Sequence, residues 1–392
     1  MDKDILILGG GPSGLSTALH LQRLAPHLAH RILILEKGHY PRPKLCAGGL
    51  VSDAEVILQR LGLDVTEIPH VDASAAHLDF EGKGLTVRVR KSHTLRVIRR
   101  DEFDDWLARK TRESGIEIRE GVTVKNVIVD PDGVTVETDS GTYRAGIVVA
   151  ADGSNGVTRR CVFPREPVYT ARVLEVITPS FDFAPQNTFV APLRANHKRD
   201  HAYFDFFPVP DGIAGYVWDF PTQVKGEPMR CWGIYDANIL ADEKRPQLKE
   251  PLAQEMARRG FDLNDYEIKG HPIRWFSPQN KMSVPRVLLV GDAVGADPIF
   301  GEGISIALGY GAVAAREISE SIQRNEFSFD GYKRRVVRSG LGQALIARWI
   351  ITYIIYPLKW KWFQILLWRI LKPIVLIVAW LFVLNWGKRL KV

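Results

Sequence analysis

The stretch 4-DILILGGGPSGL-15 decides the fold, because an apolar run leads directly into a glycine-rich turn and a helix-forming segment. Residues 4–8 are typical of a strand in a parallel sheet that is covered on both faces. Residues 12–24 carry apolar side chains at helical spacing. The turn fits G-x-G-x-x-G, in which glycines let the backbone approach a pyrophosphate and the helix N-terminus offers it free N–H groups. The residues predicted to hold this ligand are Gly9, Gly11, Pro12, Ser13 and Gly14.

A second predicted strand, 31–36, completes a βαβ unit and ends on an acidic residue. Glu36 lies 22 residues after Gly14, where a carboxylate accepts hydrogen bonds from ribose hydroxyls and repels a 2′-phosphate. Glu36 and the neighbouring Lys37 are therefore assigned to the ribose end of a dinucleotide. The alternative is a glycine-rich turn in an α/β protein that binds no nucleotide.

A second glycine-rich loop, 291-GDAVGADPIFGEGISIA-307, follows another apolar run late in the chain. An aspartate there can take ribityl or ribose hydroxyls, a proline stiffens the turn, and glycines let backbone lie against a flat ring. The N-terminus of the helix that follows stabilises the negative charge of a reduced flavin. FAD is long enough to need both loops. We therefore expect FAD, held here by Gly291, Asp292, Pro298, Gly301, Gly303 and Ile304.

Two shorter segments fit the same cofactor. In 100-RDEFDDWL-107, Arg100 precedes a helix and is expected to reach FAD; the alternative is a solvated arginine beside a helix-capping aspartate. In 151-ADGSNGVTR-159, Asp152 and Gly153 end a buried strand and are expected at the cofactor. The alternative for this pair is a plain exit from strand to turn.

The middle of the chain changes from buried strands to aromatic ones. The segments 203-YFDFF-207 and 216-YVWDF-220 are typical of antiparallel strands and flank a Pro-Asp-Gly turn. The predicted fold class is α/β: a Rossmann-like FAD-binding domain interrupted by an antiparallel β-sheet substrate domain, followed by a hydrophobic, basic helical tail. The FAD-binding domain is assigned to 1–75, 99–167 and 276–328, the substrate domain to 76–98 and 168–275, and the tail to 329–392.

The composition of the chain argues against several kinds of site and compartment. Three cysteines among 392 residues, none in a C-x-x-C pair, argue against a disulfide framework or a metal site. The first residues lack the basic and apolar regions of a signal peptide, so a reducing, cytoplasmic compartment is expected. The histidines show no pairing and are expected to be surface or core residues, as for His70, His77, His93 and His201.

The positive net charge of +7 comes entirely from the C-terminal tail. Residues 331–392 hold twelve Lys or Arg, no Asp or Glu, and six of the ten tryptophans, whereas in residues 1–330 only 40 basic residues face 45 acidic ones. Because the tail is also strongly apolar, a membrane surface suits it better than nucleic acid. Its apolar runs, 349-WIITYIIYPL-358 and 374-IVLIVAWLFVL-384, are shorter than the roughly 20 residues that span a bilayer.

Tryptophans and cations alternate between these two runs, as in segments that lie at the level of lipid headgroups. The residues concerned are Lys359, Trp360, Lys361, Trp362, Trp368, Arg369 and Lys372. We expect peripheral or monotopic association with the cytoplasmic face of a membrane, with Lys388, Arg389 and Lys391 on anionic lipid. The alternatives are a single tilted transmembrane helix over about 363–386 and a buried helical tail.

The order of these motifs resembles the FAD-dependent oxidoreductases of the para-hydroxybenzoate hydroxylase-like fold. The resemblance rests on G-x-G-x-x-G, the acidic strand end, R-x-x-F-D-x-x-L, the Ala-Asp-Gly turn and G-D-A-x-x-x-x-P-x-x-G-E-G, and covers about residues 1–325. It implies the fold and FAD. It does not choose the reaction, because that fold hosts hydroxylases, epoxidases, halogenases and reductases.

Two local features resemble the geranylgeranyl reductase family, flavoproteins that saturate isoprenoid C=C bonds. They are 44-KLCAGGL-50 and 216-YVWDFP-221, although the family usually has Pro-Cys-Gly-Gly where this chain has Leu-Cys-Ala-Gly-Gly. The resemblance implies that Cys46 lies beside flavin and substrate, and that aromatic side chains line a lipid channel. Adjacent glycines would also let backbone lie against a ring. The residues assigned to this side are Cys46, Gly48, Gly49, Phe206, Tyr216, Trp218 and Phe220.

The sequence also allows a purely structural role for each of these residues. A buried structural thiol would account for the cysteine, and core filling would account for the aromatic strand. An alternating Tyr-x-Trp-x-Phe strand does place three aromatic side chains on one face, which suits an apolar tunnel.

The resemblance implies hydride delivery from N5 of reduced FAD to an alkene carbon of a prenylated lipid, with a proton from a donor that the sequence does not identify. NADPH or a ferredoxin-like protein is the expected electron donor. One alternative is a flavin monooxygenase, hydroxylase or epoxidase, acting on a lipophilic substrate. Another is a membrane-bound flavoprotein that relays electrons to quinone. A halogenase is disfavoured because the chain has no W-x-W-x-I-P motif.

Overall fold

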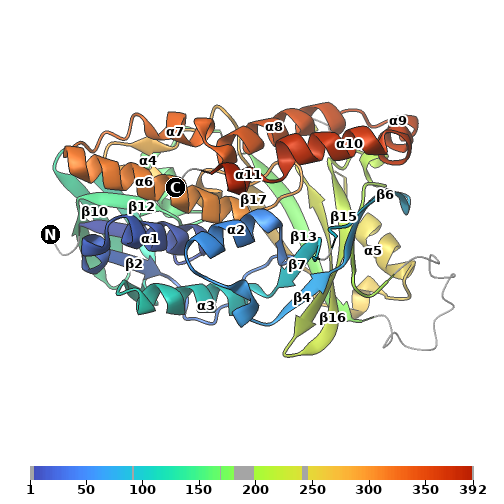
Figure 1. Ribbon diagram of the computed structural model, residues 1–392, viewed down its shortest axis with the longest axis horizontal. Helices are drawn as coiled ribbons and strands as arrows, with labels where there is room; N and C mark the ends of the chain where they lie inside the picture. The colour runs from blue at the N-terminus through green and yellow to red at the C-terminus, as the bar shows by residue number, and fades with distance from the viewer. Residues whose placement is uncertain (1–3, 91, 168, 181–197, 241–245, 391–392) are drawn as a thin grey trace.

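The computed structural model describes residues 4–90, 92–167, 169–180, 198–240 and 246–390. Figure 1 shows a cofactor-type domain beside a large twisted sheet, with helices of the C-terminal tail running along one edge of both. This arrangement confirms the predicted α/β architecture with an interrupted Rossmann-like domain.

The centre of the first domain is a six-stranded sheet in which every pair is parallel except the first. Four of its strands are completely buried, as is typical of a parallel sheet that is covered on both faces. In order across the sheet, the strands are β18 (Ser283–Val284), β19 (Val287–Leu289), β12 (Ile147–Ala150), β1 (Ile5–Leu8), β2 (Ile32–Glu36) and β8 (Glu117–Glu120).

Two long helices, α1 (Pro12–Leu24) and α6 (Ile304–Arg324), pack against each other beside this sheet. Their backbones approach closely at Gly311, where an added Cβ would lie 2.6 Å from the Ser16 side chain. Both helices were predicted at the positions where they occur. The other helices of the domain are α2 (Ser52–Arg60), α3 (Arg100–Glu113) and α4 (Val157–Val162).

Two three-stranded sheets flank the central one. One is an antiparallel meander of β9 (Val124–Asp130), β10 (Gly133–Thr138) and β11 (Gly141–Ala145). The other contains β3 (Gly49–Leu50), β7 (Leu95–Ile98) and β4 (His70–Ala73). The range 76–98 assigned to the substrate domain is therefore divided, since its last strand, β7, belongs to the second of these small sheets.

The second domain is built on a seven-stranded sheet. Every neighbouring pair is antiparallel except β14 with β5, so the sheet is mixed and not purely antiparallel as predicted. The strands in order are β17 (Lys269–Arg274), β13 (Thr170–Pro179), β16 (Glu227–Asp236), β15 (Gly215–Val224), β14 (His201–Asp205), β5 (Ala75–Phe80) and β6 (Lys83–Val87).

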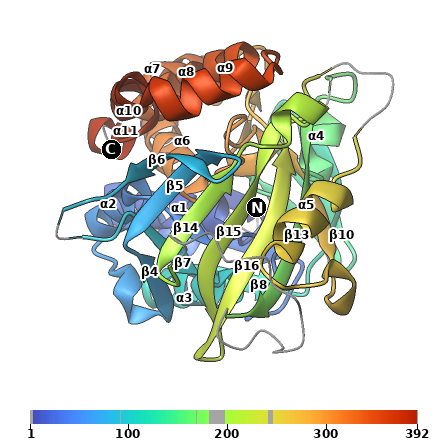
Figure 2. The same cartoon turned by 90° about the vertical axis from the view of Figure 1, so that its right-hand side faces the viewer.

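The two faces of this sheet have different neighbours. Helix α5 (Lys249–Ala257) covers the outer face, as Figure 2 shows at the side of β16. The inner face looks toward the first domain and contributes to a second hydrophobic core. Side chains alternate between the two faces along each strand, so neighbouring residues of one strand enter different environments.

The tail is helical but repeatedly broken. Its helices are α7 (Tyr332–Arg338), α8 (Gly340–Ile355), α9 (Lys361–Ile365), α10 (Lys372–Val378) and α11 (Trp386–Arg389), with π-helical turns at Leu366–Ile370 and Ala379–Val383. Among the described residues no single helix is long and apolar enough to cross a membrane. Only the pair Lys361–Ile370 and Lys372–Arg389 would reach that length together, and it is bent by 77°. A single tilted helix over 363–386 is therefore wrong.

Candidate active site

The first glycine loop forms a cradle that admits no side chains at its tightest points. Gly9 has a φ of +111°, and a Cβ added to it would collide with the carbonyl of Ala151. A Cβ on Gly14 would collide with the carbonyl of Gly9. Gly11 instead faces open space, because a Cβ there would meet nothing nearer than Arg42 at 3.9 Å. No side chain caps the N-terminus of α1, so its first N–H groups remain available to a phosphate.

The second glycine loop lies against the first. Gly291 has a φ of +59°, and a Cβ built on it would lie 2.6 Å from Ser13 Oγ. Helix α6 begins directly after Gly303 and also has no side-chain cap. A Cβ on Gly303 would meet only Asp292, at 3.8 Å. Two uncapped helix N-termini beside open glycine surfaces fit a cofactor that carries a pyrophosphate in its middle and a flat anionic ring at one end.

Glu36 organises the ribose end of the cradle. Its carboxylate accepts hydrogen bonds from the N–H groups of Gly10 at 2.8 Å and Gly38 at 2.9 Å, and pairs with the Arg42 guanidinium at 3.1 Å. Lys37 is exposed. The sequence reasoning missed Arg42 and also Tyr40, whose hydroxyl donates to the Gly10 carbonyl. Nothing in their spacing distinguishes them from ordinary loop residues.

Arg100 is buried beside the second loop and is not solvated. Its guanidinium makes a bidentate pair with Asp104 at 2.8 and 2.9 Å. Burial disfavours its charge, but Asp104, Cys46 and Asp292 raise the pKa of Arg100 above its ordinary value. The alternative with a helix-capping Asp101 is wrong, because α3 has no side-chain cap.

Asp152 stabilises the turn that follows β12, which was the alternative to a role at the cofactor. Only one of its two carboxylate oxygens takes part. Its Oδ2 accepts from the backbone N–H and the hydroxyl of Thr158, both at 2.9 Å. Its Oδ1 is buried without a hydrogen-bond partner, and burial raises the pKa of Asp152. Gly153 has a φ of +80°, and a Cβ there would meet nothing within 4 Å. Contact of this turn with FAD stays a prediction.

Asp292 is surrounded by basic side chains that the sequence does not single out. Lys44, Arg100 and His271 all lie near its carboxylate, and Lys44 Nζ is 2.9 Å from His271 Nε2. Burial lowers the pKa of both Lys44 and His271. Ser154 Oγ donates to Asp292 at 3.4 Å. The loop therefore presents a compact group of mixed charges close to the predicted flavin position.

The tail braces the second loop from behind. Arg348, completely buried in α8, pairs with Asp297 at 3.1 Å and Glu302 at 2.7 Å. Tyr356 donates its hydroxyl to the Ile299 carbonyl at 2.6 Å. Burial raises the pKa of Asp297 to about 6, against the opposing effect of Arg348. One indication of this contact was present in the sequence, because Arg348 is a single arginine within an apolar segment.

Gly48 and Gly49 are explained by the packing of the backbone, without a contact to the flavin ring. Gly48 has a φ of +78°, and a Cβ there would collide with the Ile98 carbonyl, so strand pairing between β3 and β7 requires this glycine. Gly49 faces Leu95 and Phe220 at ordinary contact distances of 3.4–3.5 Å. Contact of either glycine with flavin stays a prediction.

Cys46 is half-buried between charged neighbours. The Gly48 N–H donates to its sulfur at 3.4 Å. Burial raises the pKa of the Cys46 thiol, and the nearby Arg100 opposes that effect. The thiol lies near Arg100, and its predicted place beside flavin and substrate stays a prediction.

The predicted aromatic wall occupies the inner face of the seven-stranded sheet. Tyr216, Trp218 and Phe220 are each at most 5% exposed and lie opposite Tyr235, Gly233 and Cys231 in register. Tyr216 donates its hydroxyl to the Phe300 carbonyl at 2.5 Å. The wall is thus fastened to the second cofactor loop.

Phe206 joins the same wall from the neighbouring strand segment. Its ring stacks on Trp368 of the tail with centroids 4.1 Å apart. Trp368 is only 3% exposed, so its predicted place at lipid headgroups is wrong. Arg369 likewise turns inward and donates to the Phe80 carbonyl at 2.7 Å.

The sequence reasoning missed one buried carboxylate on the same inner face. Glu175 of β13 lies directly opposite Gly233 in register and is 7% exposed. The backbone N–H of Cys46 faces its carboxyl group and lowers its pKa, while Oε2 is buried without a hydrogen-bond partner among the described residues. Burial raises the pKa of Glu175 to about 7. A lone acid within the apolar run 173–177 was the signal available.

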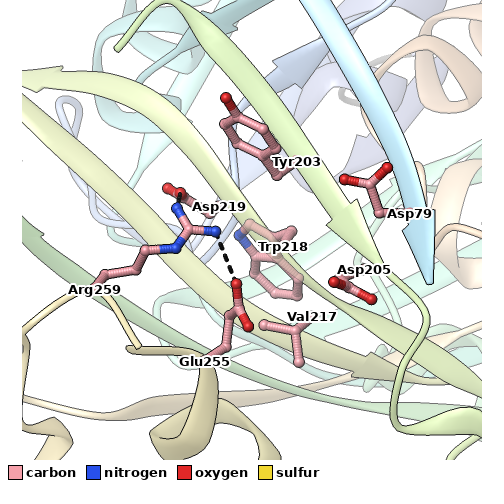
Figure 3. Close-up of a pocket in the computed structure, with 8 residues that line it drawn as sticks. All are labelled: Asp79, Tyr203, Asp205, Val217, Trp218, Asp219, Glu255 and Arg259. Atoms are coloured by element: carbon pink, nitrogen blue, oxygen red, sulfur yellow. Dashed lines mark hydrogen bonds and ion pairs between the residues drawn. The ribbon is translucent and has the colours of Figure 1, made fainter. Parts of the chain in front are cut away.

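The outer face carries a different set of charges, shown in Figure 3. Asp219 pairs with Arg230 at 2.7 Å and Arg259 at 3.1 Å, and Arg259 also pairs with Glu255 at 2.8 Å. Asp219, Glu255 and Arg259 border a cavity of about 10 Å³, room for a single water. Because these buried charges are paired, the outer-face network of Asp219, Arg230, Glu255 and Arg259 is structural.

Two histidines that were expected to be unpaired meet at the edge of this sheet. His77 Nε2 lies 2.8 Å from His201 Nδ1, because β5 and β14 run side by side. That parallel pairing joins segments more than a hundred residues apart, which is why spacing along the chain did not predict it.

Comparison with known proteins follows this geometry. The family model described as FAD binding domain matches residues 2–335. A digeranylgeranylglycerophospholipid reductase of Thermoplasma acidophilum is 27% identical over 346 residues, covering 83% of this chain and 80% of the relative. Menaquinone reductase of Mycolicibacterium smegmatis is 26% identical over 341 residues, covering 80% and 75%.

Among solved structures, a geranylgeranyl bacteriochlorophyll reductase-like protein of Thermoplasma acidophilum is similar with a TM-score of 0.76 and 22% identity, covering 97% of this chain and 92% of that one. At this identity the likeness shows the fold. The predicted cofactor and the predicted resemblance are both confirmed. The chain belongs to the FAD binding domain family, is an FAD-dependent oxidoreductase, and is similar to proteins named as geranylgeranyl reductases.

Proposed function

We propose that this protein saturates C=C bonds in the prenyl chain of a lipid. The observation that carries the proposal is the aromatic wall of Tyr216, Trp218 and Phe220, buried on the sheet face that Tyr216 fastens to the second cofactor loop. An apolar wall beside a flavin suits a hydrocarbon chain better than a polar metabolite. Relatives named digeranylgeranylglycerophospholipid reductase and menaquinone reductase support a prenylated substrate.

The proposed reaction needs a bound cofactor and a dry substrate site, and different parts of the chain would supply them. When bound and reduced, FAD supplies a hydride to an alkene carbon. The N-termini of α1 and α6 would hold its pyrophosphate and its ring through backbone N–H groups and helix dipoles. The aromatic wall excludes water, so the charge that develops on the substrate meets fixed dipoles. NADPH or a ferredoxin-like protein is the proposed electron donor.

An anaerobic mass-shift assay tests this function. The detergent-purified protein, with its flavin reduced chemically, is given geranylgeranyl diphosphate, a menaquinone and a digeranylgeranyl glycerophospholipid in parallel. We expect a gain of about two mass units per saturated bond in at least one compound. Oxygen gained only in air would make the protein a monooxygenase. Flavin oxidation by the quinone without saturation would make it an electron relay.

We also propose that the tail docks on the cytoplasmic face of a membrane without crossing it. Of the sixteen large apolar side chains that are exposed among the described residues, twelve lie between 350 and 382. Trp360, Trp362 and Trp380 are each about 60% exposed, whereas the tail's inward face packs on the core. Such a surface would carry the site to substrates that are dissolved in lipid.

Vesicle co-sedimentation tests the docking. Replacing Trp362 and Trp380 with Ser is expected to reduce binding to vesicles of mixed anionic and neutral phospholipid at least tenfold, because both side chains are exposed on the apolar surface. The matched control is Ile128→Ser, which removes an exposed apolar side chain outside the tail. Equal binding by the double variant and the wild type would contradict the proposal.

A further inference from the structure

Saturating an alkene requires a proton as well as a hydride, and the proposed function leaves the proton donor unnamed. The donor must lie on the substrate side of the flavin, be shielded from bulk water, and hold a proton at neutral pH. Five protonated side chains lie on or beside the inner face: Cys46, Glu175, Tyr216, Cys231 and Tyr235. Two of them are poor donors, because the Tyr235 hydroxyl already donates to the Pro298 carbonyl at 2.9 Å and burial raises the pKa of the Cys231 thiol well above its ordinary value.

Tyr216 is a poor candidate because its proton is already engaged. Its hydroxyl donates to the Phe300 carbonyl at 2.5 Å, and burial raises the pKa of Tyr216 well above its ordinary value. The Cys46 thiol is free to donate, but burial raises its pKa also. A thiol in that state is a much weaker acid than a carboxyl group.

Glu175 meets the geometric requirements. It projects from β13 on the same face as Trp218, which reaches across Gly233 toward it: a Cβ on Gly233 would collide with the Trp218 ring and with the Leu174 carbonyl. The backbone N–H of Cys46 faces the carboxyl group and lowers its pKa, which places the group beside the cysteine. One carboxyl oxygen, Oε2, has no hydrogen-bond partner in the described structure.

We propose that Glu175 is the acid that delivers the proton to the substrate alkene. This proposal rests on the proposed reductase function. The two electrons and one hydrogen arrive as hydride from reduced flavin at one alkene carbon, and the π-bond electrons take the Glu175 proton at the other. Two C–H bonds form, the flavin is oxidised by two electrons, and the Glu175 carboxylate is reprotonated by water.

The electrostatic surroundings support this assignment. The charged and titratable groups that face Glu175 are Cys46 from the loop before β3, Arg99 before α3, Cys231 on β16 and Lys269 on β17. Burial outweighs the opposing effects of Arg99 and Lys269 and raises the pKa of Glu175 to about 7. A carboxyl group with that pKa is both protonated and a competent acid near neutral pH.

The first part of the test needs no turnover. Difference infrared spectroscopy on flavin-free protein follows the carbonyl band of protonated carboxyl groups as pH is raised. We expect a band in the wild type that disappears through about pH 7 and is missing from Glu175→Gln. An unchanged band in Glu175→Gln would place the titrating carboxyl elsewhere and overturn the proposal.

The second part measures a single turnover of flavin reoxidation under anaerobic conditions with the three prenyl compounds named above. We expect Glu175→Gln to bind FAD and prenyl compound normally but to react about 10²- to 10⁴-fold more slowly, with partial rescue by Glu175→Asp. The control is Glu227→Gln, at an exposed position of the same sheet, with wild-type rates. A wild-type rate in Glu175→Gln overturns the acid assignment alone. A wild-type protein that saturates no alkene overturns the proposed function, and this assignment with it.

Discussion

The inner and outer faces of the seven-stranded sheet both bury carboxylates, but they treat them differently. On the outer face, Asp219 is bonded by the guanidinium groups of Arg230 and Arg259. On the inner face, Glu175 faces one backbone N–H and has an oxygen with no hydrogen-bond partner among the described residues. A buried carboxylate held by two guanidinium groups fixes structure, whereas one without a charged hydrogen-bond partner takes up a proton more readily and becomes available for chemistry.

The largest expected effect lies on the outer face. Arg230→Met removes one of the two buried guanidinium partners of Asp219 and leaves that carboxylate with less than its full set of hydrogen bonds. We expect the free energy of unfolding to fall by about 3–5 kcal/mol, which urea denaturation followed by circular dichroism would measure. The matched control is Arg109→Met, which breaks an exposed ion pair with Asp105 and should cost less than about 1 kcal/mol. Equal losses would show that the outer-face network is not structural.

A smaller, pH-dependent effect is expected on the inner face. The folded-state pKa of Glu175, about 7, lies above its ordinary value of 4.5, so the folded protein holds this proton more tightly than the unfolded chain. The contribution of Glu175 to stability is therefore present below about pH 4.5 and is lost as pH rises to about 7.

Glu175→Gln removes this dependence. The variant should gain stability relative to the wild type as pH rises through that window, by at most about 3 kcal/mol. Urea denaturation at a series of pH values measures the difference between the two proteins. A difference that does not change with pH would mean that Glu175 is not held protonated, and would remove the contrast between the two faces.

The smallest effect concerns the fastening of the inner face to the second cofactor loop. Tyr216→Phe keeps the ring but deletes the hydroxyl that bonds the Phe300 carbonyl. Thermal unfolding should show a loss of about 1 kcal/mol, because a buried carbonyl is left without this donor. Tyr169→Phe, a half-exposed tyrosine, should show no loss. If both variants behaved alike, the wall and the loop would be independent of each other.

The sequence predicts the cofactor domain well because that part depends on local rules. A strand, a glycine turn and a helix follow one another within 4–24, and Gly14 is required by a contact with Gly9 inside that unit. The second cofactor loop can be predicted equally well, because glycines directly before a helix are also a local pattern.

What the sequence could not predict depends on contacts between distant segments. Glu175 meets Cys46 only after β13 has been placed in the large sheet, and Arg348 meets Asp297 only after the tail has folded back. Trp368 was assigned to lipid because tryptophan next to arginine suits an interface, yet stacking on Phe206 buries it. Composition cannot distinguish an exposed aromatic stripe from one that the core covers.

The central claim is that the protein adds hydrogen across an alkene. The most direct measurement is anaerobic turnover in D₂O with chemically reduced flavin, followed by mass spectrometry of the prenyl chain. The hydrogen at flavin N5 and a carboxyl proton both exchange with solvent, so the account predicts two deuterium atoms for each saturated bond. An undeuterated, unsaturated chain under these conditions, with an oxygen atom gained only in air, would contradict it.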